Sequence, residues 1–430
     1  AENTFLAVSS NPFSTFAADV DTASYAQIRA QILAGNPVTA ASVRTEEMLN
    51  YFDYDYLQPI EDEPFGVTME LSDCPWNPDT KLLLLGLQAK EIPQEARPAQ
   101  NLVFLIDVSG SMDAPNKLPL VKRAFLLLLE ALDPADTVSI VTYASNDAVL
   151  LDGEKAANKV RIMETIENLS AGGSTAGAAG IQTAYALAKK HYIRDGVNRV
   201  LLATDGDLNV GVSSEGELIA LIEEKKLSGV FLSVLGFGDG NLKDNKLEAL
   251  ADHGDGNYSY IDTVFEARRA LVEEIGATFQ TVAKDVKLQV EFNPAIVKGY
   301  RLIGYENRLM ADADFADDTK DGGEVGSGHR VTVLYEIVPV GSAFEIGEIE
   351  KKYAATVVTG GSDEWLTLSI RAKEPDGGKS KLYNYTLANG AFPETLSDNL
   401  LFAAAVAQTG MLLSDSEWKG TATYQSTLSL

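Results

Sequence analysis

The feature that most constrains this chain is a short apolar run that ends in a cluster of acid and hydroxyl side chains. Residues 102–106 have the length and composition of a strand buried on both faces, as in a parallel sheet. Asp107, Ser109 and Ser111 follow at alternate positions, and a helical pattern then covers 117–132. The stretch therefore predicts an open α/β sheet with oxygen donors at the carboxyl end of a central strand, where such sheets bind ligands.

Two other strand ends offer matching side chains. Thr175 lies in a small, glycine-containing loop before a second helical pattern, and Asp205 directly follows another buried-strand pattern. Hydroxyl and carboxylate oxygens are the donors that a small divalent cation such as Mg²⁺ prefers. Because one loop can supply only part of a coordination shell, a metal site would need donors from all of these strand ends.

Together these residues resemble the metal-ion-dependent adhesion site of von Willebrand factor type A (VWA) domains, in residue type and in chain order. The resemblance implies a site for Mg²⁺, or for Mn²⁺ or Ca²⁺, formed by Asp107, Ser109, Ser111, Thr175 and Asp205. It also implies that the three hydroxyls ligate the metal and that the two acids act through bound water. The cation would then keep a position for an Asp or Glu carboxylate of a partner protein. The alternative is that Asp107 and the serines only cap the following helix.

The resemblance extends to bacterial YfbK-type VWA proteins over nearly the whole chain. The segments that carry it are 11–25, 46–52, 204–212 and 302–308. It implies an extracytoplasmic protein, in the periplasm or at the cell surface. It also implies a lipoprotein, held by a lipid anchor on a cysteine upstream of Ala1, and this would be its link to a membrane.

Charge and cysteine content narrow the possible partners. The 430 residues carry a formal net charge of −27, with a sequence pI of about 4.5. Such a chain repels nucleic acid and does not dock unaided on an anionic membrane. Cys74 is the single cysteine, so no intramolecular disulfide can form. No run in the sequence is long and apolar enough to span a bilayer.

Changes in pattern along the chain predict five parts. These are an N-terminal helical region at 1–60, strands at 61–97, a VWA domain at 98–281, a β-sandwich at 282–394, and a C-terminal helix and tail at 395–430. The strands of the second part have no sheet of their own. We therefore expect them to pair with strands of the sandwich, so that a doubly wound, mostly parallel α/β domain is inserted in an antiparallel one.

Periodicity predicts the individual elements. In the VWA domain the predicted strands are 101–107, 137–143, 198–204, 230–235 and 258–261, with an edge hairpin near 148–151. Its predicted helices are 117–132, 157–169, 176–192, 214–227, 242–252 and 263–281. The later strands are predicted at 286–292, 300–304, 329–337, 352–358, 365–371 and 381–387. Outside these domains the predicted helices are 25–34, 41–52 and 396–413, the last one packing through Leu400, Leu401, Ala404, Ala405 and Met411.

Several other patterns are weaker candidates for a site. Gly236–Asn241 imitates a dinucleotide-binding turn but lacks its last glycine, so we interpret it as a tight turn. Asp107 with Asp113 and Lys117 could suggest an aspartyl-phosphate enzyme, which would leave Thr175 unexplained. A serine hydrolase is disfavoured because no Gly-x-Ser-x-Gly motif is present.

The acidic segment 312–324 could hold Ca²⁺, although it lacks the spacing of an EF-hand loop. A solvated hairpin tip is the simpler interpretation of this segment.

These observations favour a metal-dependent protein-binding or adhesion module rather than an enzyme. The alternatives are an envelope assembly scaffold, in which the metal is structural, and a hydrolase.

Overall fold

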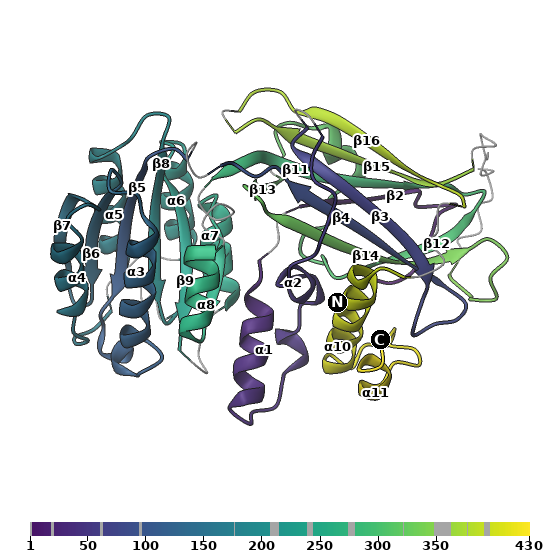
Figure 1. Cartoon of the computed structure of the whole chain (residues 1–430), viewed down its shortest axis with the longest axis horizontal. Coiled ribbons are helices and arrows are strands. Elements are labelled where there is room, and N and C mark those ends of the chain that lie inside the picture. Colours follow the sequence, from purple (N-terminus) through teal and green to yellow (C-terminus); the bar gives the residue numbers. More distant parts are fainter. Residues whose placement is uncertain are drawn as a thin grey trace. The chain divides into compact units, whose positions relative to one another are not determined.

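The computed structural model describes most of the chain: residues 2–18, 21–60, 63–93, 97–175, 177–206, 215–238, 244–273, 280–320, 322–347, 363–375, 377–390 and 396–430. The chain folds into two compact units. The first, here the β unit, consists of Ala1–Glu91 and Thr281–Leu430, and the second, here the α/β unit, of Ile92–Gln280 (Figure 1).

The α/β unit is built on a six-stranded sheet in the order β10-β9-β8-β5-β6-β7. Its strands are β5 (Gln100–Asp107), β6 (Thr137–Tyr143), β7 (Asp147–Lys155), β8 (Val197–Thr204), β9 (Phe231–Phe237) and β10 (Tyr258–Ile261). All neighbours are parallel except β7, which forms an antiparallel hairpin with β6. All eight residues of the central strand β5 are buried, which explains its continuous apolar run.

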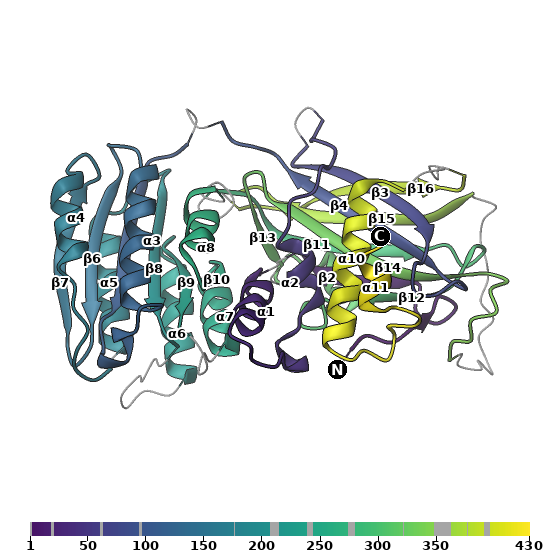
Figure 2. The ribbon, with the colours of Figure 1, turned by 60° about the horizontal axis from the view of Figure 1, so that its bottom comes forward.

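Helices cover both faces of this sheet (Figure 2). They are α3 (Leu118–Ala131), α4 (Lys159–Glu167), α5 (Gly177–Lys190), α6 (Glu215–Lys226), α7 (Asp244–His253) and α8 (Val264–Arg268), the last continued by a π-helical turn, Arg269–Glu273. α3, α4 and α8 share one face and its core, while α5 packs over β5 and β6 on the other. Stacked rings of Phe104 and Phe125, 4.2 Å apart, fix α3 to β5.

The β unit is a sandwich of two antiparallel sheets (Figure 1). One has the order β1-β12-β14-β4-β3, with β1 (Leu6–Ala7), β3 (Phe65–Asp73), β4 (Lys81–Ala89), β12 (Val297–Ile303) and β14 (Arg330–Pro339). The other has the order β13-β11-β15-β16, with β11 (Thr281–Phe292), β13 (Gly323–Gly326), β15 (Glu364–Lys373) and β16 (Lys381–Ala388); β2 (Phe13–Ala17) also pairs with β11. Their inner faces form one continuous apolar core.

The helices of the β unit pack on the outer face of the first sheet. They are α1 (Ala23–Leu33), α2 (Thr45–Asn50), α10 (Asp398–Leu413) and α11 (Tyr424–Thr427). Leu82 and Leu84 of β4 face these helices, whereas Leu83 and Leu85 face the second sheet. β4 is therefore buried on both faces although it is antiparallel, and this accounts for its run of four leucines.

The predicted fold class is confirmed: a mostly parallel α/β sheet is flanked on both sides in sequence by an antiparallel sandwich. β4 pairs with β14, so the strands before the α/β unit belong to the sheet formed by the strands after it. Most predicted strands agree with the observed ones within a few residues, and the edge hairpin near 148–151 is β7.

Some predicted elements are wrong in extent. The helix predicted at 263–281 is only α8 and a π-helical turn within the described residues, and Thr281 already belongs to β11. The helix predicted at 41–52 is a 3₁₀ turn at 40–42 followed by the short α2. On α10, Leu401 and Ala405 are only half-buried, because the tightest packing runs through Ala403 and Ala407. The strand predicted at 352–358 and the end of the turn at 236–241 lie outside the described residues.

The acidic segment 312–324 is not a solvated hairpin tip. It begins with a 3₁₀ turn, Asp312–Ala316, in which Phe315 is buried. The buried Lys287 donates to the carbonyl oxygens of Asp314 and Asp317 at 3.2 and 2.5 Å. A lysine thus organises this loop.

No helix in the described parts of the chain is long and apolar enough to cross a membrane.

Candidate functional site

The central strand β5 delivers Asp107 to the carboxyl edge of the sheet. Its side chain is fully buried, with Oδ1 accepting from the Ser109 backbone N–H at 2.9 Å and Oδ2 accepting from the Thr204 hydroxyl at 3.3 Å. Burial raises the pKa of Asp107 above its ordinary value, and the nearby charge of Asp205 raises it too, whereas hydrogen bonds from Ser109 lower it. A carboxylate in this position is costly unless a cation balances it.

Two hydroxyls follow Asp107 on the next turn of chain. The chain leaves β5 and forms a 3₁₀ turn, Gly110–Asp113, which places the Ser109 and Ser111 Oγ atoms 3.1 Å apart. Ser109 is buried and Ser111 is exposed. The pair therefore leads from the buried carboxylate to the surface, and both oxygens can serve one small ion.

The loop that carries Thr175 lies against this turn. Gly110 N–H donates to the Gly173 carbonyl at 3.0 Å, and Gly172 N–H donates to the Val108 carbonyl at 2.8 Å. Thr175 follows two residues after Gly173, and its side chain is half-buried. Backbone hydrogen bonds thus hold the predicted second loop beside the first.

Ser145, at the end of β6, fastens the same loop from the other side. Its hydroxyl accepts from the Ser174 N–H at 3.1 Å and lies 3.2 Å from the Ser174 hydroxyl. Gly173 has a φ of +84°, and a Cβ there would lie 2.7 Å from the Ser145 Oγ. Glycine is required at this position for both reasons.

Asp205 follows β8, the parallel neighbour of β5, and is nearly buried. Its Oδ2 accepts from the Lys117 ammonium at 2.8 Å, and the same ammonium donates to the Ser111 carbonyl at 2.9 Å. Lys117 thereby connects the loop that carries Ser111 to the end of β8. From the sequence, Lys117 is a candidate only in the aspartyl-phosphate alternative, because nothing local predicts its pairing with a residue 88 positions away.

Tyr143 is a second residue that sequence analysis missed. It is the register partner of Asp107 on β6 and is fully buried. Its hydroxyl lies close to the Asp107 carboxylate and the Thr204 hydroxyl. Burial, together with the charge of Asp107, raises its pKa well above the usual range, so the phenol stays neutral. The register of β5 and β6 could have predicted this neighbour, since Tyr143 ends β6 where Asp107 ends β5.

The chemistry of this donor set fits a small, hard divalent cation. Hydroxyl and carboxylate oxygens from neighbouring strand ends meet at one edge of the sheet, where the buried Tyr143 hydroxyl also lies. Among the described residues there is no cluster of three or more His, Cys, Asp and Glu side chains of the kind that holds other metals. The candidate site has only two acids, and its other oxygen donors are hydroxyls, so it is not a cluster of this kind.

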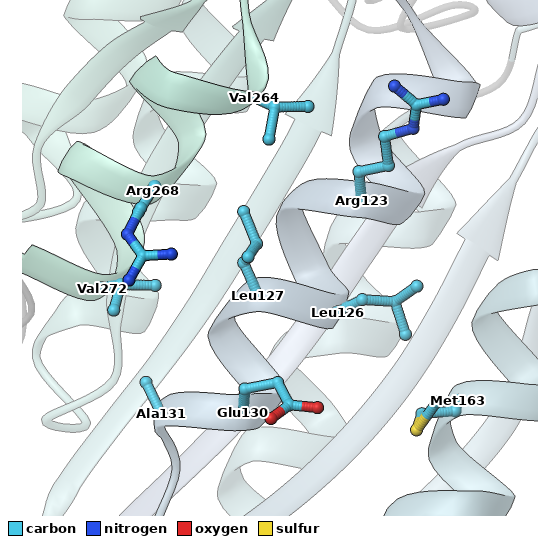
Figure 3. Close-up of a pocket in the computed structure, with 9 residues that line it drawn as sticks. All are labelled: Arg123, Leu126, Leu127, Glu130, Ala131, Met163, Val264, Arg268 and Val272. Carbon is cyan, nitrogen blue, oxygen red and sulfur yellow. The ribbon is translucent and has the colours of Figure 1, made fainter.

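A groove of the α/β unit lies between α3 and α8 (Figure 3). It encloses about 700 Å³ and is lined largely by apolar side chains such as Leu127, Met163 and Val264, with Arg123 and Arg268 among the lining residues. Leu127 is nine residues after the start of α3, roughly 13 Å along the helix axis. This groove is therefore separate from the oxygen-donor site at the strand ends.

Comparison with protein families agrees with this architecture. The family model "von Willebrand factor type A domain" matches residues 101–274, and "von Willebrand factor" matches residues 1–84. The model "Uncharacterized protein YfbK, C-terminal" matches residues 277–430. The chain is 40% identical over 436 residues to YfbK of Escherichia coli K12, covering 99% of this chain and 75% of that protein. The chain belongs to the YfbK family of VWA-domain proteins.

The resemblance that the sequence motifs indicated is thus confirmed. More distant relatives share part of the chain: mouse "calcium-activated chloride channel regulator 1" is 29% identical over 205 residues, which cover 46% of this chain and 20% of that protein. Among solved structures, a "von Willebrand factor type A from Catenulispora acidiphila" aligns with a TM-score of 0.47 and 16% identity, covering 83% of this chain and 80% of that one. VWA domains often take part in protein–protein interaction or adhesion.

Proposed function

We propose that the α/β unit of this YfbK-family protein is a metal-dependent protein-binding module without catalytic activity. Ser109, Ser111 and Thr175 would hold Mg²⁺, or Mn²⁺ or Ca²⁺, through their hydroxyls, with Asp107 and Asp205 acting through bound water. When bound, the metal would supply an electrophilic centre for an Asp or Glu carboxylate of a partner protein. The observation that carries the proposal is the junction of the three loops by Gly110–Gly173 and Lys117–Asp205 contacts.

The residues of the chain suit such a role. Neutral hydroxyls leave most of the charge of a divalent ion uncompensated, whereas carboxylates bound directly would neutralise it. Asp107 is held in place by the Ser109 N–H and the Thr204 hydroxyl, so its orientation does not depend on the ion. An acidic chain can then accept an acidic partner group, because the cation is the largest local charge.

Metal binding is the first test. Mn²⁺ is titrated into the full-length protein, and free Mn²⁺ is followed by electron paramagnetic resonance. We expect one saturable site in the wild type and its loss in Asp107→Ala and Thr175→Ala. Asp79→Ala, an exposed acid in the β unit, is the matched control and should bind as the wild type does. Wild-type protein that binds no Mn²⁺, or Asp107→Ala protein that binds it unchanged, contradicts the proposal.

Partner binding is the second test. The immobilised protein is exposed to a cell-envelope extract in Mg²⁺, and bound proteins are eluted with a chelator. We expect the chelator-released proteins to be absent from Thr175→Ala and present with Asp79→Ala. Equal retention by Thr175→Ala, or retention that survives the chelator, would count against a carboxylate completing the metal site. We further propose that the protein lies outside the cytoplasm, in the periplasm or at the cell surface. Recovery of a partner from the cell-envelope extract would be an indirect test of this location.

The alternative to a binding module is a scaffold with a structural metal. The binding module is supported by the protein hydrogen bonds that already join the loops. Mg²⁺ should raise the unfolding free energy in either case, by the linkage that its measured affinity predicts. The partner decides between them, because stabilisation by Mg²⁺ with no protein released by chelator would favour the scaffold.

A further inference from the structure

The side chain of Lys117 is held within the candidate metal site. Its ammonium lies 2.8 Å from the Asp205 Oδ2 and 2.9 Å from the Ser111 carbonyl oxygen. The Lys117 side chain is 20% exposed and the Asp205 side chain 5% exposed, so this pair is largely removed from water. A positive charge of the protein itself thus lies between two of the loops that would hold the cation.

The local structure indicates that this lysine serves the site rather than its helix. Lys117 is the N-cap residue of α3, a position that favours Ser, Thr, Asp or Asn, and its side chain makes no capping hydrogen bond. Its aliphatic part crosses Gly238 at the end of β9, where a Cβ would lie 2.5 Å from the Lys117 Cε. Because Gly238 has no side chain, the Lys117 stem has room to pass and its ammonium can reach Asp205.

Charge counting shows what this ammonium changes. Asp107, Asp205 and Lys117 sum to −1, and a divalent cation would bring the sum to +1. A partner carboxylate would then neutralise the site. Without Lys117 the sums would be −2 before the cation and 0 after it, and a partner carboxylate would leave −1.

We infer that Lys117 is a fixed counter-charge that weakens the binding of the cation and strengthens the binding of a carboxylate to the loaded site. This inference rests on the proposed metal-dependent function. A positive charge repels a cation at short range and attracts an anion, and both effects are larger where water is excluded. An ammonium is suited to this task because it is a compact point charge, here held by two acceptors.

The experiment compares Lys117→Met with Lys117→Arg in the full-length protein. Methionine keeps the length of the stem and removes the charge, while arginine keeps the charge. The concentration of free Mn²⁺ is measured by electron paramagnetic resonance at low and high salt, and the Mn²⁺ affinity is calculated from it. We expect Lys117→Met to bind Mn²⁺ about tenfold more tightly at low salt, with a smaller difference at high salt, and Lys117→Arg to stay within about threefold of the wild type.

Acetate serves as the carboxylate probe. Acetate that enters the coordination shell displaces water, so it lowers the water-proton relaxation caused by bound Mn²⁺. The half-maximal acetate concentration should rise severalfold in Lys117→Met and return toward the wild-type value in Lys117→Arg. Unchanged acetate binding in Lys117→Met overturns the inference.

The metal titration distinguishes the ways of failing. Weaker or unchanged Mn²⁺ binding by Lys117→Met, in protein with wild-type circular dichroism, overturns the inference. Weaker binding would make Lys117 a positioning residue for Asp205. If Lys117→Met is misfolded, Lys117→Gln is used with the same criteria. Absence of Mn²⁺ binding in the wild type overturns the proposed function itself, and this inference with it.

Discussion

Each unit buries a pair of opposite charges, and the two pairs differ in how they are held. In the β unit, the Arg301 guanidinium lies 3.1 Å from the Glu336 carboxylate, with both side chains almost fully buried. In the α/β unit, Lys117 lies 2.8 Å from Asp205, and the lysine is partly exposed. The first pair lies in the interior and the second at the edge of a sheet.

The partners of the two acids explain the difference in role. Glu336 also accepts hydrogen bonds from Trp76, Asn77 and Thr80, at 3.3, 2.9 and 2.8 Å. The Arg301 guanidinium is further held over the rings of Phe5 and Trp418. A carboxylate with this many donors is fixed in one geometry. At the candidate site the Lys117 ammonium offsets one of the two carboxylate charges, and its side chain is partly exposed, as expected of a place where a further charge can bind.

The largest expected effect is the loss of stability on replacing Glu336 by Ala. Removal of one member of a buried pair leaves an uncompensated charge, at a cost of about 3–5 kcal/mol. All three tryptophans lie in the β unit, so tryptophan fluorescence during denaturation reports this unit. Glu291→Ala, an exposed acid on β11, is the control. A loss below about 1 kcal/mol would mean that the pair does not lock the β unit.

A pH effect at Glu46 on α2 tests a second way of burying an acid. Burial raises the pKa of Glu46 from 4.5 to about 8, and the charges of Glu47 and Glu306 add to this. Between these two pH values the unfolded chain has released the proton and the folded protein still holds it. Stability should therefore fall as the pH rises through this window, by roughly 1 kcal/mol per pH unit, and level off above it.

Glu46→Gln should remove this pH dependence, because glutamine is neutral throughout. The measurement is the denaturation midpoint by tryptophan fluorescence from pH 5 to pH 8, roughly the window set by the two pKa values. Glu291→Gln should keep the wild-type slope. A slope in Glu46→Gln equal to that of the wild type would show that Glu46 is not the buried acid responsible.

A smaller effect, of the opposite sense to Glu336→Ala, is expected for Asp107→Asn. The carboxylate of Asp107 is buried and has no ion-pair partner among the described residues, whereas the amide of asparagine keeps an oxygen for the Ser109 N–H. Without metal, the stability of the α/β unit should be unchanged or higher, by up to about 1 kcal/mol. Hydrogen exchange of the β5 amides measures it. A loss comparable to that of Glu336→Ala would erase the distinction between the two regions.

The smallest effect is expected for Ser145→Ala. This removes the acceptor for the Ser174 N–H but keeps the Gly110–Gly173 and Gly172–Val108 hydrogen bonds. Mn²⁺ affinity should fall about two- to threefold, equivalent to less than 1 kcal/mol. Ser228→Ala, an exposed serine after α6, is the matched control. A loss as complete as that expected for Thr175→Ala would make Ser145 a principal support of the loop.

Local patterns were sufficient to predict most strands and to select the candidate site residues. The apolar run before Asp107 predicts a strand buried on both faces, and β5 is such a strand. β4 has a similar run for another reason, since the helices of the β unit cover the outer face of its antiparallel sheet. The helix predicted at 263–281 was wrong in extent, because Arg269–Glu273 forms a π-helical turn and Thr281 already begins β11.

The amino-acid sequence by itself determined the order of strands and helices, the family, and the oxygen-bearing residues at the strand ends, because periodicity and short motifs are local properties. Only the tertiary structure decided which charges meet. The ion pairs of Lys117 with Asp205 and of Arg301 with Glu336 join residues far apart in the chain, and so does the approach of the Glu46 charge to Glu306. Their partners follow from packing, which no local pattern encodes, and packing also sets how far water can balance each charge.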